Sequence, residues 1–384
     1  MKTNRENPFK YLRRKSDDKA FETSVVKSWY IARAYVLQDE QLKNVAFTHD
    51  SNEFLHVIIP NDTPQMLYLA RQIALSAHYI NFREEMGENA ARTRITIISN
   101  NPNIKQELEK EEYLCNLPKF CNYVDKEQGI ENKGSYIDIE IEIANCCPTD
   151  EGNKNTIIIN KESVNAFFYK YIDSSDDADI FKIDTRKAVF ASRMYELGGE
   201  IHNLPAEDIH CAKTYAMALD VYQHEKLKCL TDMVDSDKWS TMSLCRIKEH
   251  ISNILCSDCF RSRFNCIKQC NNKSNSSLQR IWEQYNEALS RSEHARWVTE
   301  KLILGYRPLN EDERYQDEIL HVQFNGKQKK KIFRDSLKRN DKDPAHIDLC
   351  SYTDLRRINP DDMKYDSFLM LAIPKILDKV GEND

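Results

Sequence analysis

The densest group of chemically capable side chains lies near the C-terminal end of the chain. Within a few helical turns it brings together a carboxylate, an imidazole, a guanidinium, an indole and an ammonium group, from Glu293, His294, Arg296, Trp297 and Lys301. An aromatic plane flanked by charged groups can stack on a flat ring and pair with its polar substituents. These residue types suit a flat, polar ligand such as a nucleotide base.

The element that must position these side chains is a helix that ends at Gly305. Residues three or four apart share a helix face, so the spacing predicts one face with Glu293, Trp297, Glu300 and Lys301. The alternative is an ordinary amphipathic helix, in which the tryptophan belongs to the core and the charges are solvated. Residue types alone leave both interpretations open.

Further motifs follow this helix in the order His346 to Leu349, Tyr352 to Leu355 and Pro360 to Asp366, before an apolar helix expected through Ile376 and Leu377. Together with the pattern E-H-x-R-W-x-x-E-K-x-x-x-G-Y from Glu293 to Tyr306, this order resembles one copy of the ryanodine-receptor repeat domain, over residues 278–381. The resemblance implies a small helical module with a short extended arm.

The same resemblance implies a function for these residues. In animal channels, paired repeats are implicated in adenine-nucleotide binding, and the helix tryptophan stacks on the base. Carried over by motif position, Trp297 becomes the stacking residue, and its neighbours are Glu293, His294, Lys301, Tyr306, His346 and Tyr352. Because this chain has one repeat where the animal site has two, a second subunit or another domain would have to complete the pocket.

A binding mode follows from these side chains. Lys301, with Arg296 or Arg307, would meet phosphate, while Glu293 or His346 would orient the ligand through hydrogen bonds. The expected ligand is therefore a nucleotide-derived small molecule.

Upstream, hydrophobic runs alternate between strand and helix patterns. Strands are predicted at 54–59, 93–98, 136–143, 156–159 and 179–183, and helices at 65–78 and 162–171. This alternation predicts an α/β domain with a parallel, doubly wound sheet.

Residues 50–200 resemble the Rossmann-like NAD-binding domain of TrkA-type regulators of potassium transport, on the strand Val57 to Ile59, the helix with Leu69 and Ala70, and the strand Thr93 to Ile98. The turn after the first strand, Pro60 to Met66, has no glycine to admit a pyrophosphate, and the second strand ends in Ser99 and Asn100 without an acidic residue. Asp62 would also repel phosphate from the helix start. The domain is therefore expected to be a degenerate scaffold that does not bind NAD.

Four regions are predicted: an N-terminal segment 1–49, the Rossmann-like domain 50–200, a helical connector 201–277 and the repeat domain 278–384. Connector helices should start at 204–208 and 235–239, and a polar linker at 271–277 should lead into the repeat. The lysines between Lys327 and Lys331 form a basic patch, which we interpret as a solvated loop.

Four of the 12 cysteines raise the question of a metal, with the spacing Cys256, Cys259, Cys266 and Cys270. Their surroundings lack glycine and proline and predict continuous helix, where such a spacing turns the side chains to different faces. We therefore expect free thiols and no zinc. Disulfides are not expected in a reducing compartment.

Composition limits the class of protein. With 41% hydrophobic and 30% charged residues over 384 positions, the chain is typical of globular proteins with two or three domains. It shows neither an apolar run long enough for a membrane span nor a signal peptide at Met1 to Glu6, so a cytoplasmic location is expected. A net charge of −6 disfavours general nucleic-acid binding.

Taken together, the sequence predicts a non-catalytic cytoplasmic sensor of a nucleotide-derived ligand, acting through the repeat. By analogy with fused relatives, ion-transport regulation and phage defence are the candidate settings, and a homo-oligomer or partner protein would complete the pocket. The alternatives are a protein-interaction subunit of a channel or defence complex, and a nucleotide-processing enzyme. Glu293, His294 and Arg296 could do acid–base work, but no nucleophile or metal motif accompanies them.

Overall fold

The computed structural model describes residues 19–134, 136–148, 153–172, 255, 258–271, 278–323, 325–340, 342–360, 362–363, 366–367 and 370. Several sequence predictions lie outside these residues: the strand at 179–183, the connector helix starts at 204–208 and 235–239, most of the polar linker, Cys256, and the apolar helix at Ile376 and Leu377.

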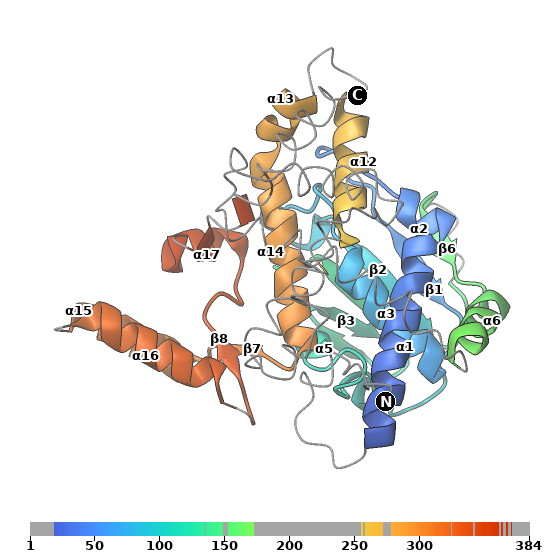
Figure 1. Ribbon diagram of the computed structural model, residues 1–384, viewed down its shortest axis with the longest axis horizontal. Coiled ribbons are helices and arrows are strands. Elements are labelled where there is room, and N and C mark those ends of the chain that lie inside the picture. The colour runs from blue at the N-terminus through green and yellow to red at the C-terminus, as the bar shows by residue number, and fades with distance from the viewer. Residues whose placement is uncertain are drawn as a thin grey trace, which may run out of the picture.

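A mixed α/β body with a parallel-rich sheet forms the first half of the described chain (Figure 1). Its six strands are β1 (His56–Ile59), β2 (Thr93–Ile98), β3 (Asn122–Asp125), β4 (Ile130–Asn132), β5 (Ile139–Ala144) and β6 (Thr156–Ile158), in the spatial order β4-β3-β5-β2-β1-β6. Only the edge pair β3 and β4 is antiparallel. The predicted parallel sheet is thus confirmed apart from that edge.

Strand β5 shows how the residue pattern dictates the pairing. Ile139, Ile141 and Ile143 are buried, and Ile141 and Ile143 lie opposite Ile95 and Ile97 of β2. The strand begins at Ile139, three residues later than predicted. Alternating isoleucines therefore fix the register, because a one-residue slip would turn every one of them to the other face.

The hairpin of β3 and β4 was not predicted. Each strand is only three or four residues long, and β4 has no buried residue, so neither shows a hydrophobic run. The two strands are joined through a turn in which Gly129 has φ of +63°, a conformation that glycine adopts without strain.

Helices cover the sheet and connect its strands. α1 (Lys19–Gln38), α3 (Pro64–Ser76) and α6 (Lys161–Ile172) pack against one another, and α2 (Glu40–Asn44) follows α1. The short helices α4 (Ile104–Leu108) and α5 (Leu117–Phe120) lie between β2 and β3 in the chain, and the 3-10 helix η2 (Glu84–Asn89) precedes β2. The helices predicted at 65–78 and 162–171 are confirmed as α3 and α6.

The C-terminal part is mainly helical. It comprises α12 (Phe260–Asn271), α13 (Leu278–Gln284), α14 (Asn286–Ile303), β7 (Arg307–Pro308), α15 (Glu311–Val322), α16 (Gly326–Lys338), β8 (Ala345–His346) and α17 (Tyr352–Ile358). The prediction of a solvated loop from Lys327 to Lys331 is wrong, because these lysines lie in the first turns of α16. Lysine is a good helix former, and Lys330 forms an ion pair with Asp317 on α15.

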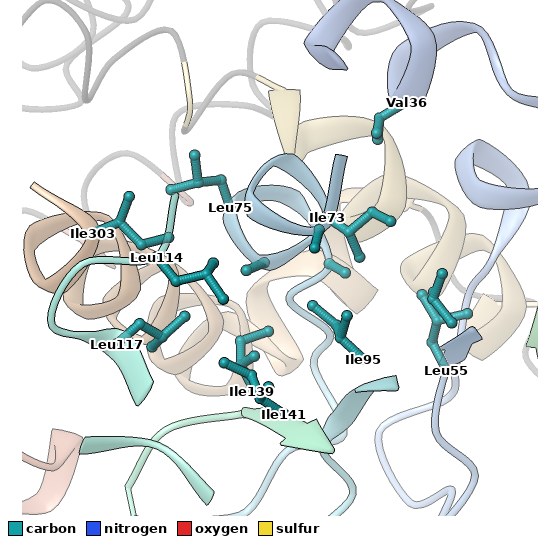
Figure 2. Close-up of a cluster of buried hydrophobic side chains, with 14 of the residues drawn as sticks. Val36, Leu55, Ile73, Leu75, Ile95, Leu114, Leu117, Ile139, Ile141 and Ile303 are labelled. Atoms are coloured by element: carbon teal, nitrogen blue, oxygen red, sulfur yellow. The ribbon is translucent and has the colours of Figure 1, made fainter. Parts of the chain in front are cut away.

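One hydrophobic cluster runs from Trp29 on α1 to Met370 and includes residues of the sheet, α3, α12 and α14. Figure 2 shows Ile303 of α14 beside Leu114 and near Leu117 at one side of this core. Asn116 also ties the end of α14 to the α/β body: its backbone N–H donates to Leu302, and its amide donates to the carbonyls of Gly305 and Tyr306. The helix that carries Trp297 is therefore part of the core that holds the sheet.

Among the described residues, none of the helices combines the length and the apolar character that crossing a bilayer requires.

Candidate functional site

Helix α14 presents two different chemical faces. Glu293, Arg296 and Glu300 follow one another at helical spacing and are fully buried. His294, Trp297 and Lys301 repeat the same spacing one position later, so they face a direction about 100° away. Glu293 and Trp297 are four residues apart and so lie close together around the helix, but they contact different groups: Glu293 pairs with Arg263 and Arg296, and Trp297 lies against His294 and His346.

The first face forms a buried ion network of Arg263, Glu293, Arg296, Glu300 and Lys301. Glu293 Oε2 lies 2.9 Å from Nη2 of Arg263, and its Oε1 lies 2.8 Å from Nη2 of Arg296. Arg296 Nη1 then reaches Glu300 Oε2 at 2.7 Å, and Lys301 Nζ reaches Glu300 Oε1 at 2.7 Å. Each of these buried charges has an opposite partner, which such burial requires.

The cations of this network set the pKa of Glu300. Burial would raise the pKa of Glu300, but the ammonium of Lys301 and the guanidinium of Arg296 outweigh it, so that its pKa is lowered. Glu300 is therefore a carboxylate, and Glu293 and Arg296 are paired with each other inside the protein.

The second face contributes to an aromatic group, the Trp297 cluster, made of His294, Trp297, Lys301, Tyr306, His346 and Tyr352. The imidazole of His346 meets the Trp297 ring edge to face, with centroids 4.9 Å apart. His294 lies nearly parallel to Trp297 at 6.1 Å, and Lys301 Nζ lies 5.5 Å from the indole centroid. Tyr306 and Tyr352 contact His346 and His294, with centroids 6.4 and 5.7 Å apart.

Three elements build this cluster. α14 supplies His294, Trp297 and Lys301, the parallel pair of β7 and β8 supplies His346 and holds Tyr306 beside it, and Tyr352 is the first residue of α17. Trp297 is the only member that is partly exposed, while the other members are buried. Six of the nine residues that the sequence predicted to bind a ligand thus lie together. Of these six, only Trp297 is partly exposed to solvent.

Both imidazoles of the cluster are neutral in the folded protein. Burial lowers the pKa of His294 and lowers that of His346 well below its usual value, and Lys338 and Lys301 lower the latter further. His294 Nε2 lies 3.0 Å from the carbonyl oxygen of Cys350, so this nitrogen carries the proton and donates it. His346 Nδ1 accepts from the N–H of Asp348 at 3.2 Å, which leaves its proton on Nε2.

Two carboxyl groups next to the cluster were not predicted as site residues. Burial raises the pKa of Asp348 to about 7, and burial together with Glu293 raises the pKa of Asp366 well above its usual value. Asp348 accepts a hydrogen bond from the amide of Asn359, and Asp366 lies 3.8 Å from His294 Nδ1. Their positions within the motifs His346 to Leu349 and Pro360 to Asp366 were the only sequence signal.

Arg307 lies apart from the cluster. Its guanidinium contacts Glu313 at 2.7 Å and Asp343 at 2.8 Å. Hydrogen bonds to both carboxylates raise its pKa. Arg307 therefore holds the start of α15 to the segment before β8, and a phosphate would have to compete with two carboxylates for it.

At the sheet edge where a dinucleotide would bind, polar side chains form hydrogen bonds with one another. At the carboxyl ends of β1 and β2, Ser99 Oγ donates to Asp62 Oδ2 at 2.6 Å. Asn61 Oδ1 accepts from the backbone N–H and the hydroxyl of Thr63, just before α3. These groups bind one another at the place where glycines would admit a pyrophosphate.

Cys259 and Cys266, two of the four cysteines considered for a metal site, have different hydrogen-bond partners. Cys259 donates to the carbonyls of Leu75 and Ser76, whereas Cys266 accepts from the N–H of Phe47. Burial raises the pKa of both thiols to about 12. No cluster of three potential metal ligands occurs among the residues that the structure describes.

The chemistry available at the Trp297 cluster is recognition through stacking and hydrogen bonding. Its nearest thiol, Cys350, has its pKa raised to about 12 by burial, which makes it a poor nucleophile. Neutral imidazoles, phenols, an ammonium and an indole can together surround a planar, polar molecule. Comparison of this chain with protein-family models, with curated proteins and with solved structures finds no match.

Proposed function

We propose that this protein is a non-catalytic sensor that binds a nucleotide-derived small molecule at the Trp297 cluster. The observation that carries the proposal is the convergence of three chain segments on one partly exposed tryptophan, surrounded by buried groups that can donate or accept hydrogen bonds. The α/β body then acts as a Rossmann-like scaffold, in which Ser99 and Asp62 form a hydrogen bond at the glycine-free edge of β1 and β2.

In this proposal the base stacks on the indole of Trp297 and the phosphate draws the ammonium of Lys301. Lys301 is the cation suited to this role, because it lies by the indole, whereas Arg296 is enclosed between Glu293 and Glu300. The neutral His346 retains one N–H donor on Nε2 for the ligand. A stacking contact of this kind contributes about 1–3 kcal/mol.

The test is calorimetry with ATP, cyclic AMP, NAD and ADP-ribose, on the wild type and on Trp297→Ala. We expect the affinity of whichever compound binds to fall about 10- to 100-fold in the variant, because a stack is lost. Arg307→Ala is the matched control, since its ion pairs lie outside the cluster. Equal binding by the wild type and Trp297→Ala would remove the stacking role.

A second candidate function is a protein-interaction subunit, for instance of a channel or a defence complex. It is favoured by the exposed charges and exposed Tyr315 and Ile332 of α15 and α16. Capture of a defined partner protein that is unaffected by Trp297→Ala and by all four compounds would support this function over ligand sensing.

A further inference from the structure

Helices α15 and α16 form a two-helix unit, the α15–α16 hairpin, that extends away from the α/β body (Figure 1). The helices are locked to each other through Asp317, whose two oxygens bind Arg334 at 2.7 and 2.9 Å and which also binds Lys330 at 3.1 Å. Asp317 is almost fully buried. It therefore marks the inner face of α15, as Lys330 and Arg334 mark the inner face of α16.

Each helix of this hairpin carries an apolar residue on its outer face. Tyr315 is two residues from Asp317, and Ile332 is midway between Lys330 and Arg334, so both point away from the helix–helix contact. Their exposed fractions are 66% and 63%. A tyrosine and an isoleucine at such exposure, on opposite sides of the hairpin, are two potential contact points.

The two outer faces have opposite charge. The exposed charged side chains of α15 are Glu311, Asp312, Arg314 and Glu318, a net charge of −2, whereas those of α16 are Lys327, Lys329 and Lys331, a net charge of +3. Glu311 and Glu318 flank Tyr315; Lys331 precedes Ile332, and Lys327 lies one helical turn before Lys331. All four are exposed and form no ion pair with any residue that the structure describes.

We infer that this hairpin is a self-association surface, on which the basic face of α16 in one molecule docks against the acidic face of α15 in a second copy. Charge complementarity favours a second copy, because the same unit presents both an acidic and a basic face. Because the two faces lie on opposite sides, the contact is head to tail, and each bound pair leaves one face of each sign free. Assembly can therefore continue beyond a dimer.

This inference stands apart from ligand binding at Trp297, so the two can fail separately. The experiment is sedimentation velocity over a range of protein concentrations, at about 50 mM and about 500 mM salt, where screening lengths differ about threefold. We expect the sedimentation coefficient of the wild type to rise with concentration at low salt and to stay at the monomer value at high salt. The variant Trp297→Ala should behave like the wild type.

Two charge-reversed variants make the test specific. Lys327→Glu/Lys331→Glu and Glu311→Lys/Glu318→Lys should each be monomeric alone, because both outer faces then carry the same sign. Their equimolar mixture should associate again, since opposite faces are restored. Lys154→Glu/Lys161→Glu is the matched control: it makes the same charge change at exposed positions of the α/β body and should associate like the wild type.

A wild type that remains monomeric at low salt and high concentration would overturn the inference, and so would a mixture that fails to associate. Retention of a monomeric wild type on heparin, lost in Lys327→Glu/Lys331→Glu, would assign the basic face to a polyanion and also contradict self-association. A folded state for each variant is verified by its circular dichroism spectrum.

Discussion

Asp348 is a buried carboxyl group near Trp297 whose pKa lies close to neutral pH. Its carboxyl lies 3.6 Å from His346 Nδ1, accepts from Asn359, and is close enough to Asp362, Lys338 and Arg334 to interact electrostatically with them. Burial raises its pKa to about 7. A carboxyl with a raised folded-state pKa stabilises the protein at low pH, and this contribution is lost as the pH rises through the folded value.

The variant Asp348→Asn should therefore be more stable than the wild type by a margin that grows from pH 5 to pH 8, by about 2 kcal/mol. The amide keeps an acceptor for Asn359, and titration of His294 and His346 is common to both proteins. Urea unfolding at the two pH values measures the difference. Asp312→Asn, at an exposed position of α15, should show no such change, and a margin independent of pH would contradict the assignment.

At this scale the sequence could name residues but not their contacts. Spacing of three to four placed Glu293, Trp297, Glu300 and Lys301 on one face, and the resemblance by motif order added His294, His346 and Tyr352. It could not show that Glu293 and Arg296 neutralise each other in the core, because Arg263 lies far upstream on another helix. The site residues themselves remain predictions.

Among the elements, α17 depends on a carboxylate from the α/β body. Glu84 of η2 accepts from the N–H groups of Tyr352 and Thr353 at 3.1 and 2.8 Å, and from the hydroxyl of Thr353. Free N–H groups at a helix start require such acceptors, and a negative charge there is favourable. The contact joins the first residue of α17, Tyr352, to a segment before β2.

Replacing Glu84 by alanine should destabilise α17 by about 0.5–2 kcal/mol, the range typical of a lost helix cap. Hydrogen exchange should become faster in the first turn of α17 and stay unchanged in β1 and β2. Glu85→Ala is the control, because Glu85 is exposed and reaches Arg291 only at 3.7 Å. Equal exchange in Glu84→Ala and Glu85→Ala would contradict the capping role.

Elements with a strong hydrophobic period were predictable, and short ones were not. β2 was predicted to its ends, and α3 within two residues, because their apolar residues repeat at the required spacing. β7 and β8 have two residues each and owe their pairing to tertiary contacts. The lysine run of α16 was misread since its helix is held by Asp317, a partner outside the run.

On the scale of the whole molecule, α12 and α14 share a hydrophobic core with the sheet and are joined to each other by a buried ion pair. The core from Trp29 to Met370 is continuous, and the Glu293 ion network lies within it. This core therefore contains residues from both the predicted Rossmann-like region and the predicted repeat, and two small separate clusters lie around Leu309 and Tyr352. Sequence patterns are local, so they could not reveal this continuity.

The variant Glu293→Ala should lower the global free energy of unfolding by about 3–5 kcal/mol, because Arg263 and Arg296 lose a buried counter-charge. Hydrogen exchange in β2 and β5 should accelerate together with that in α14. Glu287→Ala, on the exposed side of the same helix, should cost less than about 1 kcal/mol. An effect confined to α14 would show that the two parts unfold independently.

Lys301 is the one side chain shared by the Glu293 ion network and the Trp297 cluster. A ligand phosphate that attracts its ammonium would leave Glu300 with Arg296 as its remaining cation in this network. By thermodynamic linkage, ligand binding at Trp297 would change the stability of the buried ion pairs, and a change in those ion pairs would alter the affinity for the ligand by the same free energy. Lys301 alone would then couple ligand binding at the surface to the buried ion pairs of the core.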